Sequence, residues 1–212
     1  MGRFFPMVLA ALVLVACQTQ TQAVATPSPS LSPTPHTAPT VAILQSAEAP
    51  AGLSVCVGSG PIDVYLATLS AANAPFAEDA ASQWGNLLQQ GARDGAISIF
   101  AASTSACGVE LGSTTGTKAI TTFVAQFGDE GEADRAWQSG VFGFVPPPVG
   151  EVVTGLVRGP STGLGLSSFT YERPSVRLAS WRRSVFVAVV VASNLDAAAF
   201  RAATAAIDPR LN

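Results

Sequence analysis

Histidine and lysine are almost absent from this sequence of 212 residues, which has one of each, His36 and Lys118. Serine and cysteine hydrolases need a general base beside the nucleophile, most often a histidine. His36 lies in a proline-rich stretch, and a Ser–Lys arrangement would depend on Lys118 alone, outside any characteristic motif. We therefore expect no catalytic residue of these kinds, and a protein that is more readily a binding domain than an enzyme.

Charge is scarce as well, since charged residues make up 12% of the chain and the formal net charge is −3. The sequence has no basic stripe that could follow a phosphate backbone. Gly159, Gly163 and Gly165 lie in a glycine-rich turn, outside the strand–GxGxxG–helix context of a nucleotide site. We expect no nucleic-acid partner and no cofactor.

Apolar runs long enough to span a membrane are also missing. The longest, from Phe4 to Ala16, has 13 residues, whereas a spanning helix needs roughly 20. It follows the single charge of Arg3, and this start and length are typical of a secretory signal peptide over residues 1–16. The rest of the chain is therefore expected outside the cytoplasm.

The run ends in Leu14-Val15-Ala16-Cys17, which resembles the lipobox of bacterial lipoproteins. The resemblance implies cleavage before Cys17, diacylglyceryl transfer to its thiol, and acylation of the new amino group by a fatty acid such as palmitate. Two or more acyl chains anchor a protein stably, whereas one binds only marginally. We expect an extracytoplasmic protein that is lipid-anchored to the bacterial cell membrane through Cys17.

Composition divides the mature chain in two. Residues 17–40 are rich in proline, threonine and serine and carry no charge, which favours a disordered tether with extended polyproline character. Residues 41–212 are long enough for a single domain with its own core. Cys56 and Cys107 are an even pair in an exported chain, which favours a structural disulfide. The alternative is a redox-active pair, but the two cysteines lack the C-x-x-C spacing that is typical of one.

Helical spacing dominates the first half of this domain. Ile62, Tyr65, Leu66 and Leu69 follow Pro61, and Phe76, Ala80, Trp84, Leu87 and Leu88 recur between Pro75 and Gly91. Residues 94–106 combine strand-like alternation with alanines, and we expect a short helix there. The pattern thus predicts helices before the first long strand.

Strands dominate the second half. The expected strands span 117–127, 151–157, 166–172, 176–182 and 185–192, the last apolar on both faces as in a covered strand. Asp129 and Glu132 predict a helix start, and Asn194 the cap of a final helix that Pro209 ends. The sequence predicts an α+β domain, with an antiparallel sheet of about four to five strands and helices packed mainly on one face.

Residues 118–211 are similar to exported lipoproteins and sensor-like domains of high-GC bacteria. The similarity is carried by the stretch from Phe123 to Trp137, Gly163-Leu164-Gly165, Trp181-Arg182-Arg183, a valine-rich strand and a final alanine-rich helix. It implies a sheet-plus-helix domain and carries no catalytic residues. Where the related pattern often has an acidic pair after the glycines, this chain has Leu166-Ser167-Ser168.

Three groups of residues are candidates for recognition. Phe142 and Phe144, followed by Pro146, could anchor a partner from a stiff loop or fold back on the core. Arg182 and Arg183 could meet an anionic ligand, or guard a solvated sheet edge. Carboxylates at 129, 130, 132 and 134 could bind Ca²⁺, but lack its loop pattern and equally suit a helix start; we expect no metal.

Together these features favour a lipid-anchored binding or accessory domain for a protein, peptide or other envelope component. The sequence leaves two alternatives open. One is an envelope hydrolase with an acid/base pair that lacks histidine, and the other is a small-molecule sensor or carrier, which a deep apolar pocket would favour.

Overall fold

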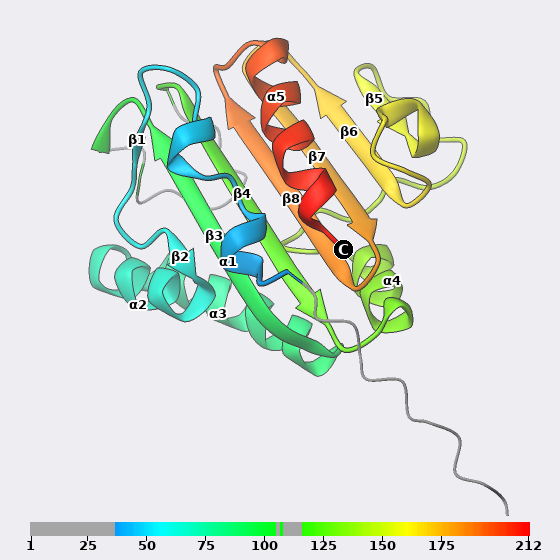
Figure 1. Ribbon diagram of the computed structural model, residues 1–212, viewed down its shortest axis with the longest axis horizontal. Coiled ribbons are helices and arrows are strands. Elements are labelled where there is room, and N and C mark those ends of the chain that lie inside the picture. The colour runs from blue at the N-terminus through cyan, green and yellow to red at the C-terminus, as the bar shows by residue number, and fades with distance from the viewer. Residues whose placement is uncertain (1–36, 105–106, 108–115) are drawn as a thin grey trace, which may run out of the picture. The chain divides into compact units, whose positions relative to one another are not determined.

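The computed structural model describes residues 37–104, 107 and 116–212 (Figure 1). The expected signal peptide over 1–16, Cys17 and the tether up to His36 lie outside these residues. The first helix, α1 (Pro39–Ala42), starts within the segment assigned to the tether, and Pro39 is already buried. The folded part of the chain therefore begins before residue 41.

One antiparallel sheet of eight strands runs through the domain, in the order β1-β3-β4-β8-β7-β6-β5, with β2 also paired to β3. The strands are β1 (Ser54–Val55), β2 (Gly60–Pro61), β3 (Ala92–Ala101), β4 (Ala119–Phe127), β5 (Leu156–Arg158), β6 (Ser168–Glu172), β7 (Val176–Arg183) and β8 (Phe186–Ser193). The α+β class with an antiparallel sheet is confirmed, but the expected number of four to five strands is wrong. Two of the additional strands, β1 and β2, have two residues each, too few to show an alternating pattern.

The third additional strand is β3, which corrects the short helix expected over 94–106. It pairs with β4 from Ala92↔Phe127 to Ala101↔Ala119. Ile97 and Ile99 enter one hydrophobic cluster, while Ala96 and Phe100 enter the cluster on the opposite face. The helix preference of the alanines is overridden because Ile97 and Ile99 on one side and Phe100 on the other fill a strand that is covered on both faces.

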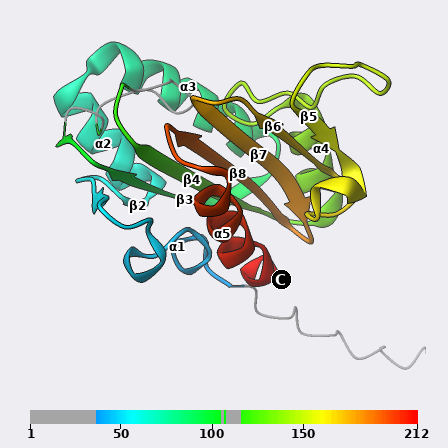
Figure 2. The ribbon, with the colours of Figure 1, turned by 90° about the horizontal axis from the view of Figure 1, so that it is seen from above.

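Helices cover both faces of the sheet, so the expectation that they lie mainly on one face is not confirmed. Figure 2 shows α2 (Ile62–Ala72), α3 (Ala74–Gln89) and α4 (Glu130–Ser139) on one side, and α1 and α5 (Ala197–Ile207) on the other. The reason lies in the central strands. The odd-numbered valines of β8, from Val187 to Val191, pack under α2, α3 and α4, whereas Ala188, Val190 and Ala192 pack under α1 and α5. A strand that is apolar on both faces needs both covered.

The helices α4 and α5 both begin at an aspartate cap, and the cap of α5 is not the residue that was predicted. The Asp129 carboxylate accepts a hydrogen bond from the Glu132 amide at 2.8 Å and so begins α4, as expected. The cap of α5 is Asp196, which accepts from the Ala199 amide at 2.8 Å, rather than Asn194. Asn194 has a left-handed backbone (φ 51°) and its side-chain amide donates to the Thr117 carbonyl, so it shapes the preceding turn.

A disulfide and an ion pair link segments of the domain that are distant in the sequence. Cys56 and Cys107 form the expected disulfide, which ties the segment after β1 to the segment after β3. Arg210, in the 3-10 helix after α5 (Asp208–Arg210), forms an ion pair with Glu48, in the 3-10 helix after α1 (Ser46–Glu48). The two ends of the described chain are therefore joined on the α1/α5 face.

Across the described residues, each helix is too short or too polar to cross a membrane.

Candidate functional site

The aromatic residues expected in a recognition loop pack onto the core. Phe142 is 8% exposed and meets the Phe123 ring edge-on, with 4.7 Å between ring centroids. Phe144 is partly buried against the same cluster. Pro146 is half-buried on the loop that follows. Of the two interpretations open for this loop, the placement of Phe142 and Phe144 favours the one in which it folds back on the core.

Arg182 and Arg183 point to opposite faces of the sheet. Arg182 Nε lies 3.1 Å from Asp134 in α4, without hydrogen-bond alignment. Arg183 makes two hydrogen bonds of 2.7 Å to Asp208, after α5. The fold therefore does not bring the two arginines and the loop residues Phe142, Phe144 and Pro146 into one surface, since Arg183 lies across the sheet from Phe142.

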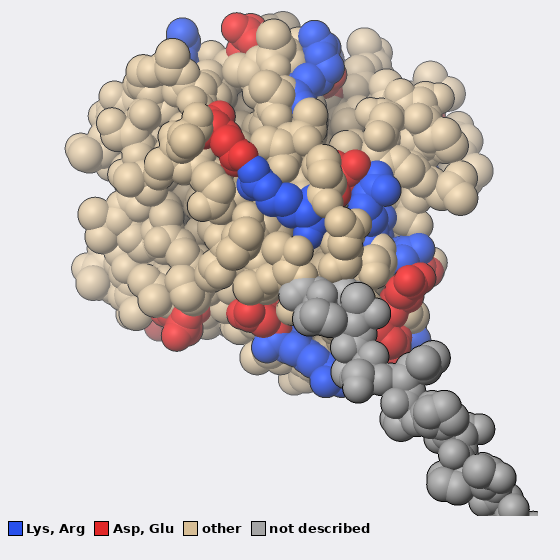
Figure 3. Space-filling view, viewed as in Figure 1, with Lys and Arg blue, Asp and Glu red and all other residues tan. Residues whose placement is uncertain are grey.

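On the α1/α5 face, basic and acidic side chains lie side by side in short mixed runs, and most of the surface is uncharged (Figure 3). The pair of Arg183 and Asp208 belongs to this mixed pattern. Such a face has no large area of one sign to attract a polyanion.

The acidic cluster at the start of α4 is engaged within the protein. Asp129 caps the helix, and Glu132 accepts from the Gly128 amide at 2.9 Å. Asp134 faces Arg182, with Glu130 at 3.9 Å from the same arginine. Among the described residues, no group of three or more potential ligand side chains is placed to hold a metal ion. The arrangement is that of a capped helix start pinned to β7.

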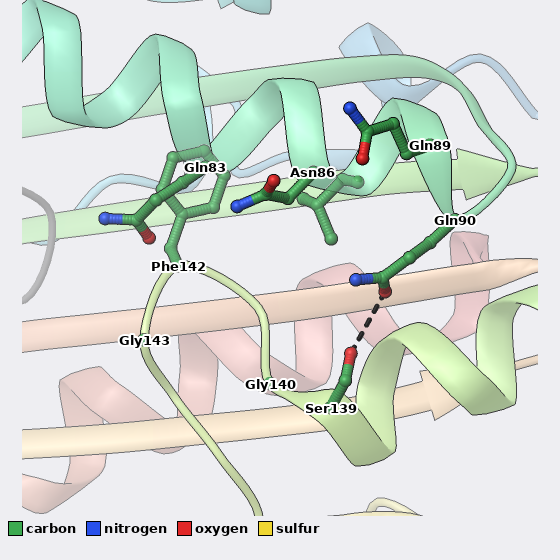
Figure 4. Close-up of a pocket in the computed structure, with 9 residues that line it drawn as sticks. Gln83, Asn86, Gln89, Gln90, Ser139, Gly140, Phe142 and Gly143 are labelled. Atoms are coloured by element: carbon green, nitrogen blue, oxygen red, sulfur yellow. Dashed lines mark hydrogen bonds between the residues drawn. The ribbon is translucent and has the colours of Figure 1, made fainter.

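A groove of 390 Å³ opens between the second half of α3 and the end of α4 (Figure 4). Gln83, Asn86, Leu87 and Gln90 have helical spacings of three, four and seven residues and therefore share one face of α3. Ser139, the last residue of α4, faces them. The described residues that line the groove are Gln83, Asn86, Leu87, Gln89, Gln90, Ser139, Gly140, Phe142 and Gly143.

Primary amides make up most of the polar lining. Ser139 Oγ lies 3.0 Å from Gln90 Oε1 and 3.0 Å from the Ala136 carbonyl, and its single hydrogen can serve one of them at a time. Within the described part of the chain, the side-chain amides of Asn86 and Gln89 make no hydrogen bond to protein. The groove therefore offers donors and acceptors that a ligand can use.

The loop that follows α4 forms a stiff wall of this groove. Gly140 and Gly143 have positive φ angles of 97° and 79°, and Phe142 between them has φ 49°, which is costly for a residue with a side chain. The buried Phe142 ring, held against Phe123, fixes this backbone. A wall that is already ordered loses little conformational entropy when a ligand binds.

A second hollow of 530 Å³ continues from the first and shares Gln89, Gln90 and Ser139 with it. Its described lining adds Glu132 and Arg135 from α4. The combined groove therefore has an uncharged part under α3 and a part with one acidic and one basic side chain beside α4. Because α3 and α4 both end at the groove, the partial negative charge of two helix C-termini acts there.

Sequence reasoning missed this groove, although part of its signal was present. The helix over 75–91 was predicted, and Gln83, Asn86 and Gln90 already form a polar stripe at helical spacing. The wall opposite the stripe depends on where the end of α4 docks, which no local pattern shows.

Comparisons of this chain with protein-family models, with curated proteins and with solved structures find no match. The geometry of the site itself is therefore the basis for the functional argument.

Proposed function

We propose that this chain is an extracytoplasmic binding domain, held at the bacterial cell membrane by lipid on Cys17, that takes its ligand in the groove between α3 and α4. The observation that carries the proposal is the lining of the 390 Å³ groove. Among described residues it consists of carboxamides, a hydroxyl, glycine backbone and two apolar side chains. Such a lining can hold a ligand by several hydrogen bonds. It contains no Asp, Glu, His, Lys, Cys or Tyr side chain among the described residues that could act as a general acid or base.

The groove and the start of the described chain lie on opposite faces of the sheet. The described chain starts at α1, which packs on the same face as α5 (Figure 2). The groove belongs to α3 and α4, on the opposite face. The groove therefore lies across the sheet from the point at which the described chain begins.

The anchor is tested by intact-mass analysis of the protein extracted from membranes. The expected mass is that of the chain beginning at Cys17 with a diacylglyceryl group and a further fatty-acyl group. Cys17→Ser should abolish the modification and release a protein that stays folded. An unmodified wild-type chain in the membrane fraction would contradict the anchor.

The groove is tested by sedimentation of the full-length protein with delipidated cell-envelope fragments of the producing bacterium. Asn86→Trp places a large ring in the groove from an exposed position of α3, and Ala81→Trp places the same ring at an exposed position of α3 outside it. We expect Asn86→Trp to lower retention at least tenfold and Ala81→Trp to leave it unchanged. Equal retention of both variants would overturn the groove as binding site. Turnover of an envelope component that a groove variant abolishes would instead support the hydrolase alternative.

A further inference from the structure

The uncharged part of the groove indicates what kind of ligand it accepts. We propose that the ligand is a neutral oligosaccharide, bound through its hydroxyl groups; this inference rests on the binding function proposed above. The described lining of the 390 Å³ space holds no Asp, Glu, Lys, Arg or His. A charged ligand would lose its hydration there without gaining a partner of opposite charge. The lining therefore favours a ligand that is neutral where it lies under α3.

The C-terminal ends of α3 and α4 also favour a neutral ligand over an anionic one. The last carbonyl groups of α3, at Gln89, and of α4, at Ser139, have no partner within their own helices and carry partial negative charge. They favour hydrogen-bond donors and disfavour anions. Sugar hydroxyls donate and accept, so they suit both the carbonyl groups and the carboxamides.

The spacing of the amides along α3 suits a ligand of several linked sugar rings. A helix rises 1.5 Å per residue, so Gln83 and Gln90 are about 10.5 Å apart along α3, with Asn86 between them. A carboxamide has two N–H donors and one carbonyl acceptor, and the Asn86 amide can pair with two neighbouring hydroxyl groups of one sugar ring. Gln83 already donates one N–H to Asp79 at 2.6 Å and its Oε1 is buried, so it offers one further N–H, whereas Gln90 Oε1 is shared with Ser139. The stripe thus offers successive contacts over roughly the length of a disaccharide.

Peptide ligands fit the same surface less well. Peptides are commonly held by an open strand edge or by apolar pockets that take side-chain anchors. This groove is walled by two helices and a loop, and its apolar floor is small because Leu87 is 2% exposed and Phe142 8% exposed. A peptide would find neither a strand partner nor room for an apolar anchor.

The test uses the full-length protein in a detergent without a sugar headgroup. The neutral probes are maltotriose, cellotriose and triacetylchitotriose, the anionic probe is trigalacturonate, and the peptide probe is trialanine with acetylated and amidated ends, so that it carries no charge. Binding is followed by saturation-transfer NMR and by calorimetry. We expect at least one neutral trisaccharide to bind and the anionic and peptide probes to bind at least tenfold more weakly.

Matched variants locate the binding. Asn86→Leu and Gln90→Leu remove groove amides, and each should weaken trisaccharide binding about fivefold or more, as the loss of one hydrogen bond implies. Gln138→Leu removes an amide of α4 that does not line the groove and should leave binding unchanged. Circular dichroism and melting temperature check that each variant is folded.

Three results would overturn the inference: no neutral trisaccharide binds, trigalacturonate or trialanine binds as well as the neutral probes, or Gln138→Leu and Asn86→Leu lose binding equally. The envelope-retention experiment separates these failures from failure of the proposed function. Groove-dependent retention without sugar binding would refute the oligosaccharide and leave the binding domain standing. Loss of both would refute both.

Discussion

Ser139 Oγ lies 3.0 Å from Gln90 Oε1, and this contact joins the last residue of α4 to the residue that caps α3 (Figure 4). The two residues are 49 positions apart in the chain. Their contact lies where the two hollows meet, because both residues line both of them. It therefore helps to set the distance between the walls of the groove.

Ser139→Ala tests this contact. We expect the free energy of unfolding to fall by about 0.5–1 kcal/mol relative to a control, because the hydroxyl hydrogen bond that Ser139 shares between Gln90 and the Ala136 carbonyl is lost. The control is Ser82→Ala, an exposed serine of α3 outside the groove, which gains the same helix propensity from alanine. Urea unfolding of both variants gives the difference, and equal stabilities would show that the contact contributes nothing.

Phe142→Ser separates a core role from an interface role. Because Phe142 is 8% exposed and packs on Phe123, we expect a loss of about 3 kcal/mol or more in the free energy of unfolding. Phe76→Ser is the matched change at a phenylalanine that is 37% exposed, and it should cost clearly less. Thermal unfolding measures both. A Phe142→Ser protein as stable as the wild type would mean that the ring is not part of the core.

The strands show what local pattern can and cannot decide. β8 was predicted because its valines leave no polar face, and only a covered strand can be apolar throughout. β3 is also covered on both faces, but its alanines suit a helix as well as a strand. The strand forms because the segment pairs with β4, which is distant in the sequence. Asp129 was identifiable as a cap from its spacing to Glu132, whereas Asn194 and Asp196 both suit a cap by residue type, and the backbone decides between them.

Local sequence pattern also could not reveal the candidate site. Phe142 and Arg182 were singled out because of their residue types, but packing and ion pairing take up their side chains. Asn86 and Gln90 attract no notice as a motif, since amides on a helix are usually only solvated. They become a groove wall through the docking of α4 against the end of α3, a tertiary event.

Acid should weaken the link between Glu48 and Arg210. Burial raises the pKa of Glu48, but hydrogen bonds from Arg210 and the Gln45 amide and the charge of Arg210 outweigh it, so the pKa lies below its ordinary value of 4.5. A carboxylate with a lowered pKa in the folded state stabilises the fold above its unfolded pKa, and this stabilisation is lost as the pH falls through the lowered value.

The measurement is calorimetric unfolding from neutral pH to below 4.5, comparing wild type with Glu48→Gln. The stability difference between the two proteins should be constant near neutrality and shrink on acidification. A difference that stays the same at low pH would show that Glu48 does not titrate with folding.

Reduction of the disulfide should destabilise the domain. Cys56 and Cys107 close a loop with a sequence separation of 51, for which the chain-entropy argument gives up to about 4 kcal/mol. Unfolding with and without reductant measures the loss. The Cys56→Ser/Cys107→Ser double variant is the control, and it should not respond to reductant.

The most direct test of the proposed binding site observes the groove amides themselves. In ¹H–¹⁵N spectra of the full-length protein, titration with a neutral trisaccharide should shift the side-chain NH₂ signals of Asn86, Gln89 and Gln90. The Gln138 NH₂ signal, from outside the groove, should stay in place. If a trisaccharide or an envelope fragment binds while these three signals do not move, the groove between α3 and α4 is not the binding site.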